Sequence, residues 1–116
     1  MNARVKSALF VAAYIRRCAV EGAVAVLRRR GAEDAGAIFV KVDRLDGRAA
    51  LYGPAPQSLI GEDDGVRRFV RVTKDGASPL DAEERLQKEI RFDPDLWAVE
   101  CEDRSGRHFL DLAEED

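Results

Sequence analysis

Residues that bind metals or carry covalent chemistry are scarce in this chain of 116 residues. It has one histidine, His108, and two cysteines, Cys18 and Cys101. A closed tetrahedral zinc site takes four nitrogen or sulfur ligands, so these three side chains are one too few. Both cysteines sit among apolar residues, and we interpret them as small buried hydrophobes with free thiols. The sequence therefore predicts no metal, no cofactor and no disulfide, in keeping with a reducing cytoplasm.

Long apolar runs and phosphate-binding glycine motifs are missing as well. The apolar run 8–15 is far shorter than the roughly 20 residues that cross a bilayer, and Arg16 and Arg17 follow it directly. No small-residue cleavage site of a signal peptide comes after it. Neither G-x-G-x-x-G nor G-x-x-x-x-G-K-[ST] occurs, and no serine lies in a G-x-S-x-G elbow. These absences argue against a membrane span, a standard nucleotide loop and a serine hydrolase, and favour a cytoplasmic location.

A basic excess is also lacking, because 19 lysines and arginines face 22 acids and the net charge is −3. Dedicated nucleic-acid binders usually carry net positive charge, since phosphate neutralisation supplies much of their affinity. Arginines nevertheless gather at Arg28, Arg29, Arg30, Arg67 and Arg71. Such a cluster can bind an anion or a nucleic acid, with Phe69 between Arg67 and Arg71 to stack a base. We favour the alternative that the arginines pair with acids such as Glu100 and Glu102 across strands.

Acidic residues offer two further candidates for chemistry. The cluster 62–65 (EDDG) lacks the spacing of a calcium-binding loop, and we interpret it as a solvated loop. Asp43, Glu100 and Glu102 could meet across a sheet as the acids of an enzyme. A lone histidine on a strand is more often a packed or edge residue than a catalyst, so we assign His108 no catalytic role.

The segment 5–21 contains no glycine or proline and predicts an N-terminal helix that ends at Gly22. Its apolar residues recur at three- and four-residue spacing, which predicts one buried stripe. The stripe comprises Val5, Ala8, Leu9, Ala12, Ile15 and Ala19. Phe10 and Tyr14 form a second apolar pair beside it. Because this apolar band is wide, the helix is either deeply packed or shared with a partner.

Much of the remaining chain alternates apolar and polar residues with the two-residue period of β-strands. The predicted strands cover 23–28, 37–43, 48–52, 66–73, 97–102 and 108–112. Asp46-Gly47 predicts a tight antiparallel hairpin between the second and the third of them. The segment 104–107 predicts another hairpin, which would place 108–112 beside 97–102. In 37–43 the alternation predicts a half-buried strand.

A second helix is predicted before the last hairpin. Ser78 is its cap, Pro79 its first residue and Asp81 the partner of the cap, and Asp93-Pro94 ends it. Asp81 and Glu84 offer a second capping box three residues later, which leaves a later start open. Strands with one apolar face need a cover, and two helices can provide it. The sequence therefore predicts a single α+β domain over residues 1–116. It would have two layers, a mostly antiparallel sheet of about five or six strands and helices mainly on one face.

Four segments together give the chain a family resemblance. They are 36–47 (GAIFVKVDRLDG), 51–55 (LYGPA), 91–100 (RFDPDLWAVE) and 102–110 (EDRSGRHFL). In these segments, and in length and order over nearly the whole chain, the sequence resembles the small bacterial family catalogued as domain of unknown function 1491. The resemblance implies no activity, cofactor or catalytic residue, so the segments keep their physical meaning as a hairpin, a helix exit and a second hairpin.

Four aromatic residues are candidates for an exposed apolar interface, because exposed apolar patches commonly mark interaction sites. They are Phe10, Tyr14, Trp97 and Phe109. Together with the wide apolar band of the first helix, they favour a non-catalytic protein-interaction or accessory module that binds itself or another protein. Two alternatives stay open. One is binding of nucleic acid or another anion by the arginines, and the other is an enzyme that uses acids brought together by the fold.

Overall fold

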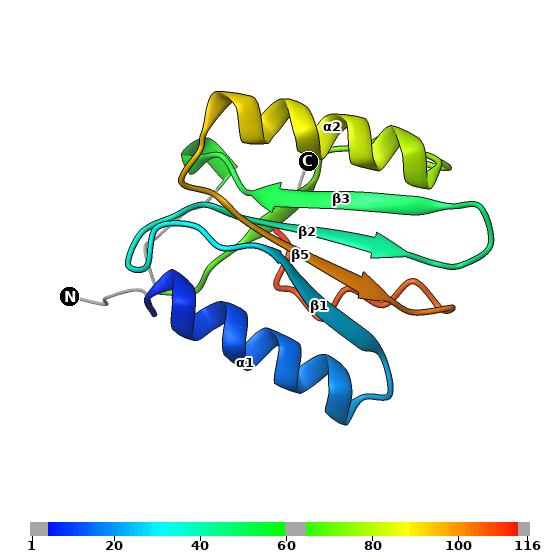
Figure 1. Cartoon of the computed structure of the whole chain (residues 1–116), viewed down its shortest axis with the longest axis horizontal. Helices are drawn as coiled ribbons and strands as arrows, with labels where there is room; N and C mark the ends of the chain where they lie inside the picture. The colour runs from blue at the N-terminus through cyan, green and yellow to red at the C-terminus, as the bar shows by residue number, and fades with distance from the viewer. Residues whose placement is uncertain (1–4, 60–64, 114–116) are drawn as a thin grey trace.

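The computed structural model describes residues 5–59 and 65–113. Within these ranges, two helices and five strands follow one another (Figure 1). The order is α1 (Ser7–Val20), β1 (Val24–Arg29), β2 (Ile38–Asp43), β3 (Ala49–Pro54), a 3-10 turn (Gln57–Leu59), β4 (Phe69–Arg71), α2 (Pro79–Phe92) and β5 (Trp97–Glu102).

The five strands form one mixed sheet in the order β1-β5-β2-β3-β4. The last strand lies in the interior of the sheet, antiparallel to β1 and parallel to β2, with Val99 beside Val40. A parallel neighbour needs a long crossover connection, which the chain supplies through β3, β4 and α2. The other neighbouring pairs are antiparallel. The prediction of an α+β fold with a mostly antiparallel sheet is confirmed.

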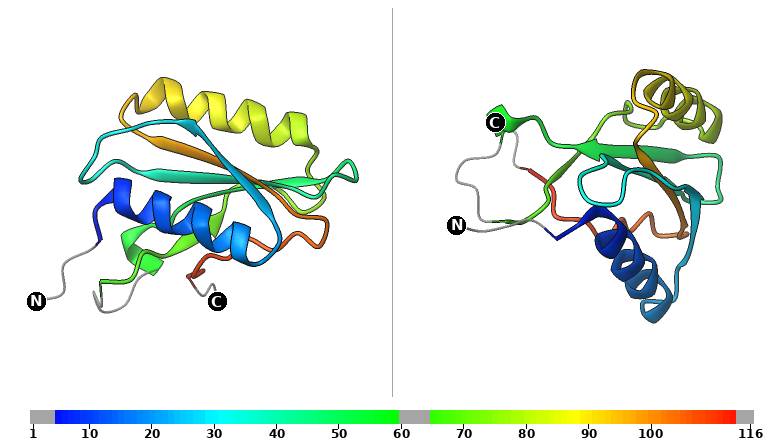
Figure 2. Two further views of the ribbon diagram at one scale, coloured as in Figure 1. Left: turned by 60° about the horizontal axis from the view of Figure 1, so that its bottom comes forward. Right: turned by 60° about the vertical axis from the view of Figure 1, so that its left-hand side comes forward.

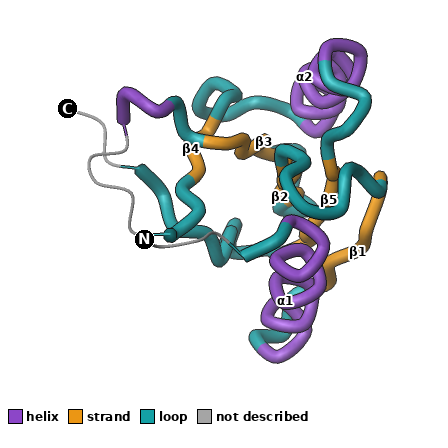
Figure 3. Tube along the Cα trace, turned by 90° about the vertical axis from the view of Figure 1, so that its left-hand side faces the viewer, coloured by secondary structure: helices purple, strands orange, loops and turns teal. Residues whose placement is uncertain are grey.

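The two helices lie on opposite faces of the sheet, so the elements form three layers and not the predicted two (Figures 1 and 3). The reason is that the central strands bury both faces. On β2, Val40 packs with α1 residues, whereas Phe39 packs with Leu86 of α2. Even Lys41 on this strand is only 7% exposed. The prediction that 37–43 is half-buried is therefore wrong. The alternation in its sequence came from Lys41, a charged residue that is buried because it forms an ion pair with Glu83.

Helix α1 buries a different stripe from the one its apolar spacing predicted. The side chains that face the sheet are Ser7, Val11, Tyr14 and Cys18. Leu9, by contrast, is 63% exposed, and Ala12 and Ala19 are exposed with it. Hydrogen bonds fix the rotation of the helix, since the Ser7 hydroxyl donates to the Gly36 carbonyl at 2.6 Å. Apolar residues surround most of α1, so periodicity alone did not distinguish its inner from its outer side.

Helix α2 and the first hairpin form as local signals predict. The Ser78 hydroxyl accepts a hydrogen bond from the Asp81 amide, and the Asp81 carboxylate accepts one from the Ser78 amide, each at 3.1 Å. This is a capping box with Pro79 in the first turn. Between β2 and β3 the chain turns through Gly47, whose φ of 89° suits glycine. These elements depend on neighbours in sequence, which is why their signals were sufficient.

The C-terminal segment does not form the predicted hairpin with β5. Both edges of β5 are occupied, by β1 and β2, so no edge remains for 108–112. The segment crosses instead on the α1 side of the sheet and reaches β4 (Figure 2). There the Phe69 amide donates to the Asp111 carbonyl, and the Ala113 amide donates to the Phe69 carbonyl, each at 2.9 Å.

Candidate functional site

Two of the four predicted interface aromatics lie in the core. Tyr14 is 5% exposed and Trp97 is 2% exposed. The indole nitrogen of Trp97 donates to the Ala32 carbonyl at 2.7 Å, which ties the loop after β1 to β5. Trp97 is therefore unavailable to a partner. Phe10 and Phe109 are half-buried and reach the surface.

Phe10, Tyr14 and Phe109 nevertheless come together, because they line one groove between α1 and the C-terminal segment. The groove has a volume of about 180 Å³. Its lining consists of Phe10, Ala13, Tyr14, Arg17, Phe109, Leu110 and Asp111. The i, i+3, i+4 and i+7 spacing of its α1 residues places them on one side of the helix. We call this feature the α1 groove.

The floor of the α1 groove is held by the Tyr14 side chain. Its hydroxyl donates to the His108 carbonyl at 2.8 Å and so fixes the C-terminal segment against the helix. Burial raises the pKa of Tyr14 well above its ordinary value, and the nearby thiols of Cys101 and Cys18 add to this. The hydroxyl is thus a neutral donor in a structural bond.

One wall of the groove is Phe109, which adopts the left-handed backbone region with a φ of 58°. A bulky residue rarely occupies this region, and the conformation costs about 1–3 kcal/mol. Two guanidinium groups hold its ring, Arg17 at 5.8 Å and Arg107 at 5.0 Å from the centroid. Arg107 is itself fixed by Asp103, at 2.7 Å. The strained backbone therefore presents an aromatic ring framed by arginines at the surface.

The other wall is Phe10, which packs on Phe69 of β4 with ring centroids 5.8 Å apart. The Arg67 guanidinium lies over the Phe10 ring, at 5.6 Å from its centroid. Arg67 also donates to the Ser7 hydroxyl oxygen at 3.0 Å and to the Val5 carbonyl at 2.9 Å. This wall is anchored to both the sheet and the start of α1, so the groove is preformed.

The predicted arginine cluster is divided among separate places. Arg28 pairs with Glu83 and with Glu100, the second across neighbouring strands as we favoured. Arg29 donates to the Pro94 carbonyl at 2.7 Å, and the Arg30 guanidinium lies 5.2 Å from the centroid of the Trp97 ring. Arg67 lies over the Phe10 ring beside the α1 groove. Arg71 pairs with Asp75 at 3.5 Å. The described contacts of Arg67 and Arg71 are therefore with residues other than the acids of β5.

Among the acidic candidates, Asp43 of β2 and Glu102 of β5 are register partners on neighbouring strands, whereas Glu100 lies beside Lys41 and pairs with Arg28. Across 5–59 and 65–113, no group of three histidine, cysteine or acidic side chains is placed to hold a metal ion. The acids at 62–64 lie outside the described residues. Cys18 and Cys101 are free and buried, and burial raises the pKa of the Cys101 thiol to about 12. None of the described helices is long and apolar enough to cross a membrane.

These features define a small α+β protein with a preformed apolar groove beside its first helix. The chain belongs to the family of proteins of unknown function DUF1491, whose pattern it matches over residues 5–111. No curated protein matches it.

Solved structures from two bacteria resemble the whole chain. It is 42% identical to protein Atu0922 from A. tumefaciens, known from a solution structure, with a TM-score of 0.81 over 97% of this chain and 98% of that one. It is 38% identical to a DUF1491 family protein from Caulobacter crescentus CB15, known from a crystal structure, with a TM-score of 0.79 over 95% of this chain and 99% of that one. An NMR structure of a DUF1491 family protein from the same bacterium gives 38% identity and a TM-score of 0.76, over 99% of both chains.

Sequence reasoning found the aromatic residues of the groove but not their neighbours. Leu110 and Asp111 were assigned to a strand of a hairpin, whereas they line the groove. The position of these two residues follows from the order of the strands in the sheet. Once β5 lies between two strands, the segment after it has to pack elsewhere, and the wide apolar band of α1 is the surface available to it.

Proposed function

We propose that this protein is a non-catalytic protein-interaction module of the bacterial cytoplasm, and that the α1 groove receives an apolar side chain of a partner protein. The observation that carries the proposal is the convergence of Phe10, Tyr14 and Phe109 on one preformed groove. Aromatic and arginine side chains are enriched in the cores of protein interfaces, and anchors that fill such pockets supply much of the binding energy. The two free buried cysteines support a reducing compartment.

The charges around the groove favour an acidic partner segment. Arg17 lines the groove and Arg107 stands beside Phe109, while Asp111 is the acid in the lining. Complementary charges guide association and select among partners. A segment that carries a leucine or phenylalanine anchor with aspartate or glutamate on either side would match this pattern.

The apolar surface continues beyond the groove on the outer side of α1. Leu9 lies one turn before Ala13, and Val20 at the end of the helix is 78% exposed. Exposed apolar side chains at helical spacing give an amphipathic partner further contacts along the same helix. A shared interface would thus explain why α1 carries more apolar side chains than the sheet covers.

A different protein suits this surface better than a second copy of the chain. Antiparallel pairing of two α1 helices would bring Arg16 and Arg17 of both copies into one interface. Like charges placed close together oppose association. An acidic partner removes this repulsion, and nucleic acid is less suitable because the groove itself is apolar.

The experiment compares two charge insertions on the same exposed helix surface. Ala13→Glu places a carboxylate in the groove, whereas Ala12→Glu places one outside its lining. Each new glutamate stands four residues before an arginine, so the two variants gain the same helical ion pair and are matched in stability. Affinity purification from the native host identifies the partner. Its binding segment is then made as a peptide and titrated against wild type and both variants.

We expect Ala13→Glu to lower the affinity for the peptide at least about tenfold, as loss of an interface anchor does. Ala12→Glu should leave the affinity within about twofold of the wild-type value. The bound segment should carry an apolar anchor flanked by acids. Equal binding by both variants would show that the groove is not the interface, and a bound segment without acids would contradict the proposed charge preference. Light scattering supplies the remaining test, because a dimer that Ala13→Glu dissociates would make the occupant a second copy.

A further inference from the structure

A second pocket lies at the far end of the β2–β3 hairpin, on the face of the sheet that α1 covers. Its volume is about 210 Å³. The lining comprises Val42, Arg44, Arg48, Ala49, Ala50, Tyr52, Arg71, Lys74, Asp75, Gly76 and Gly106. Four of these residues are cationic and one is anionic, although the whole chain has a net charge of −3. We call it the hairpin pocket, and the sequence analysis singled out only Arg71 among its residues.

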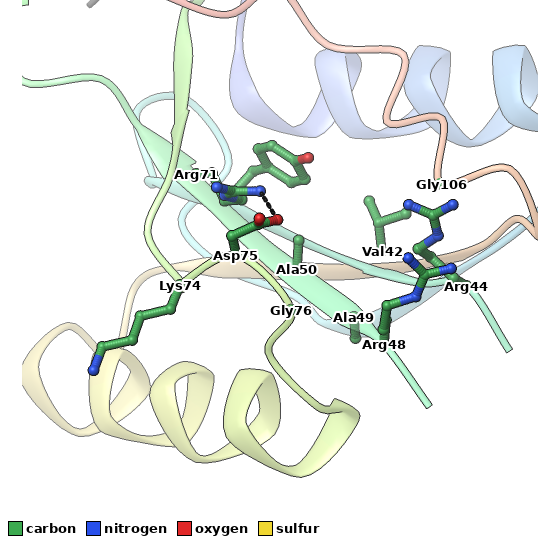
Figure 4. Close-up of a pocket in the computed structure, with 11 residues that line it drawn as sticks. Val42, Arg44, Arg48, Ala49, Ala50, Arg71, Lys74, Asp75, Gly76 and Gly106 are labelled. Atoms are coloured by element: carbon green, nitrogen blue, oxygen red, sulfur yellow. Dashed lines mark hydrogen bonds and ion pairs between the residues drawn. The ribbon is translucent and has the colours of Figure 1, made fainter. Parts of the chain in front are cut away.

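The cationic groups stand on opposite sides of a small apolar floor (Figure 4). Arg71 and Asp75 lie at one side, and Arg44 and Arg48 lie together at the other, across Ala50. The Lys74 ammonium points away from them. Because the floor is made of short side chains, the space between the guanidinium groups is open to a small molecule.

The neighbouring acids do not satisfy all the hydrogen-bond donors of these arginines. The Arg71 guanidinium is 3.5 Å from the Asp75 carboxylate, and that side chain is 96% exposed, so the pair is loose. The Arg44 Nε is buried and finds no hydrogen-bond acceptor among the described residues, with the Asp46 carboxylate 4.0 Å away. Asp46 instead binds Arg48 closely. Arg44 and Arg71 are therefore the two groups poised for an external anion.

A glycine on each of two loops borders the pocket. A Cβ atom on Gly106 would lie 3.1 Å from Arg44 Nη1 and 3.2 Å from its Cζ, so a larger residue would displace the guanidinium slightly. Gly106 also has a φ of 74°, and Gly76 across the pocket has a φ of 78°, a region that suits glycine. Gly106 therefore packs closely against Arg44, whereas a Cβ atom on Gly76 would meet no atom within 4 Å and this glycine serves the turn of its own loop.

We propose that the hairpin pocket binds the phosphoryl group of a small phosphorylated molecule. Arginine forks bind phosphate and carboxylate oxygens in pairs. A tetrahedral phosphoryl group accepts such pairs from several directions, whereas a planar carboxylate accepts them mainly in one plane. Guanidinium groups on opposite walls therefore favour the phosphoryl group. The volume is below the 300–1,000 Å³ typical of sites for drug-sized ligands, which limits the remainder of the molecule to a few atoms. This inference is independent of the partner proposed for the α1 groove.

The test uses inorganic phosphate as the probe and succinate as the carboxylate comparison, each titrated into the isotope-labelled full chain. Amide NMR signals of Gly76 and Gly106 report on the two loops of the pocket. The variants are Arg44→Gln, Arg71→Gln and Arg71→Lys. Arg91→Gln is the matched control, because this arginine lies in the last turn of α2 on the opposite face of the sheet and loses the same charge. The remaining amide signals show whether each variant is folded.

Phosphate should shift both glycine signals saturably and bind more tightly than succinate. Arg44→Gln and Arg71→Gln should each weaken phosphate about tenfold or more, as loss of a charge-assisted hydrogen bond does. Arg71→Lys should weaken it less than Arg71→Gln, and Arg91→Gln should change it less than about twofold, as an exposed charge does. Absence of saturable shifts, equal losses in the control, or succinate binding at least as tightly would overturn the proposal.

Discussion

Arg28 on the edge strand β1 and Glu83 on α2, 55 positions apart in sequence, form a two-bond ion pair. Arg28 Nη1 donates to Glu83 Oε1 at 2.6 Å, and Arg28 Nη2 donates to Glu83 Oε2 at 2.9 Å. The buried Lys41 Nζ lies 3.1 Å from the same Oε1 atom. A carboxylate that receives three such bonds is held charged, and the Arg28 hydrogen bonds keep the pKa of Glu83 well below its usual range. This pair joins α2 to a strand that the helix does not cover.

The first prediction concerns Glu83→Gln. It removes the charge that compensates Lys41, so the free energy of unfolding should fall by about 1–3 kcal/mol. Glu84→Gln, on the exposed side of the same helix, should change it by less than about 0.5 kcal/mol. Urea denaturation at neutral pH measures both. Equal effects of the two variants would mean that the ion pair adds nothing beyond helix charge.

The same pair gives the stability an acid dependence with a defined sign. The folded pKa of Glu83 is lowered, so its contribution is complete above the unfolded value of about 4.3 and is lost as pH falls through the lower folded value. The difference in unfolding free energy between wild type and Glu83→Gln should therefore shrink below this pH. A difference that stays constant on acidification would contradict the assigned charge.

The second prediction concerns His108, whose pKa is lowered from 6.5 by burial. Its Nδ1 accepts a hydrogen bond from the Leu110 amide at 2.9 Å, which requires that nitrogen to be unprotonated. As pH falls below 6.5, the unfolded chain binds a proton that the folded chain resists. Stability should therefore decrease with falling pH from 6.5 down to the folded pKa.

NMR measures this titration directly, because the chain has one histidine and hence one imidazole Cε1 proton signal. The midpoint should lie below 6.5, and His108→Gln should remove the pH dependence of unfolding in this window. A midpoint at or above 6.5 would show that the ring is solvated or paired with an acid in solution.

The third prediction concerns the two thiols. Cys18 and Cys101 are buried in the core, and burial raises the pKa of Cys101 to about 12. The thiolate is the reactive form, so neither cysteine should react with a water-soluble disulfide reagent in the folded protein at mildly alkaline pH. Both should react on addition of denaturant. Rapid labelling of the native chain would show that the space between α1 and β5 opens.

Local signals predicted the elements whose formation depends on sequence neighbours. Ser78, Pro79 and Asp81 determined where α2 begins, and Gly47 marked the first hairpin. Such features are sufficient because their hydrogen bonds connect residues three or four positions apart. Of the four aromatics that the sequence suggested as an interface, Phe10 and Phe109 reach the surface, and their residue type could be recognised without knowing what lies between them.

Contacts between distant segments decided the rest. The position of β5 between β1 and β2 gave it two partners, and that excluded the C-terminal hairpin. The same sheet has apolar side chains on both faces, which separated the helices into two layers. No local pattern records which strands become neighbours, because strand order depends on how several surfaces pack at once.

The sequence by itself determined the α+β class, most of the elements and the lack of the common nucleotide, zinc and serine-hydrolase motifs, since these follow from composition, spacing and short-range hydrogen bonds. Only the tertiary structure decided which side of α1 is covered and that Tyr14 and Trp97 are buried. It also decided which residues meet in the α1 groove and the hairpin pocket. The physical reason is that each of these depends on the free energy of packing segments far apart in the chain, which residue spacing within one segment does not contain.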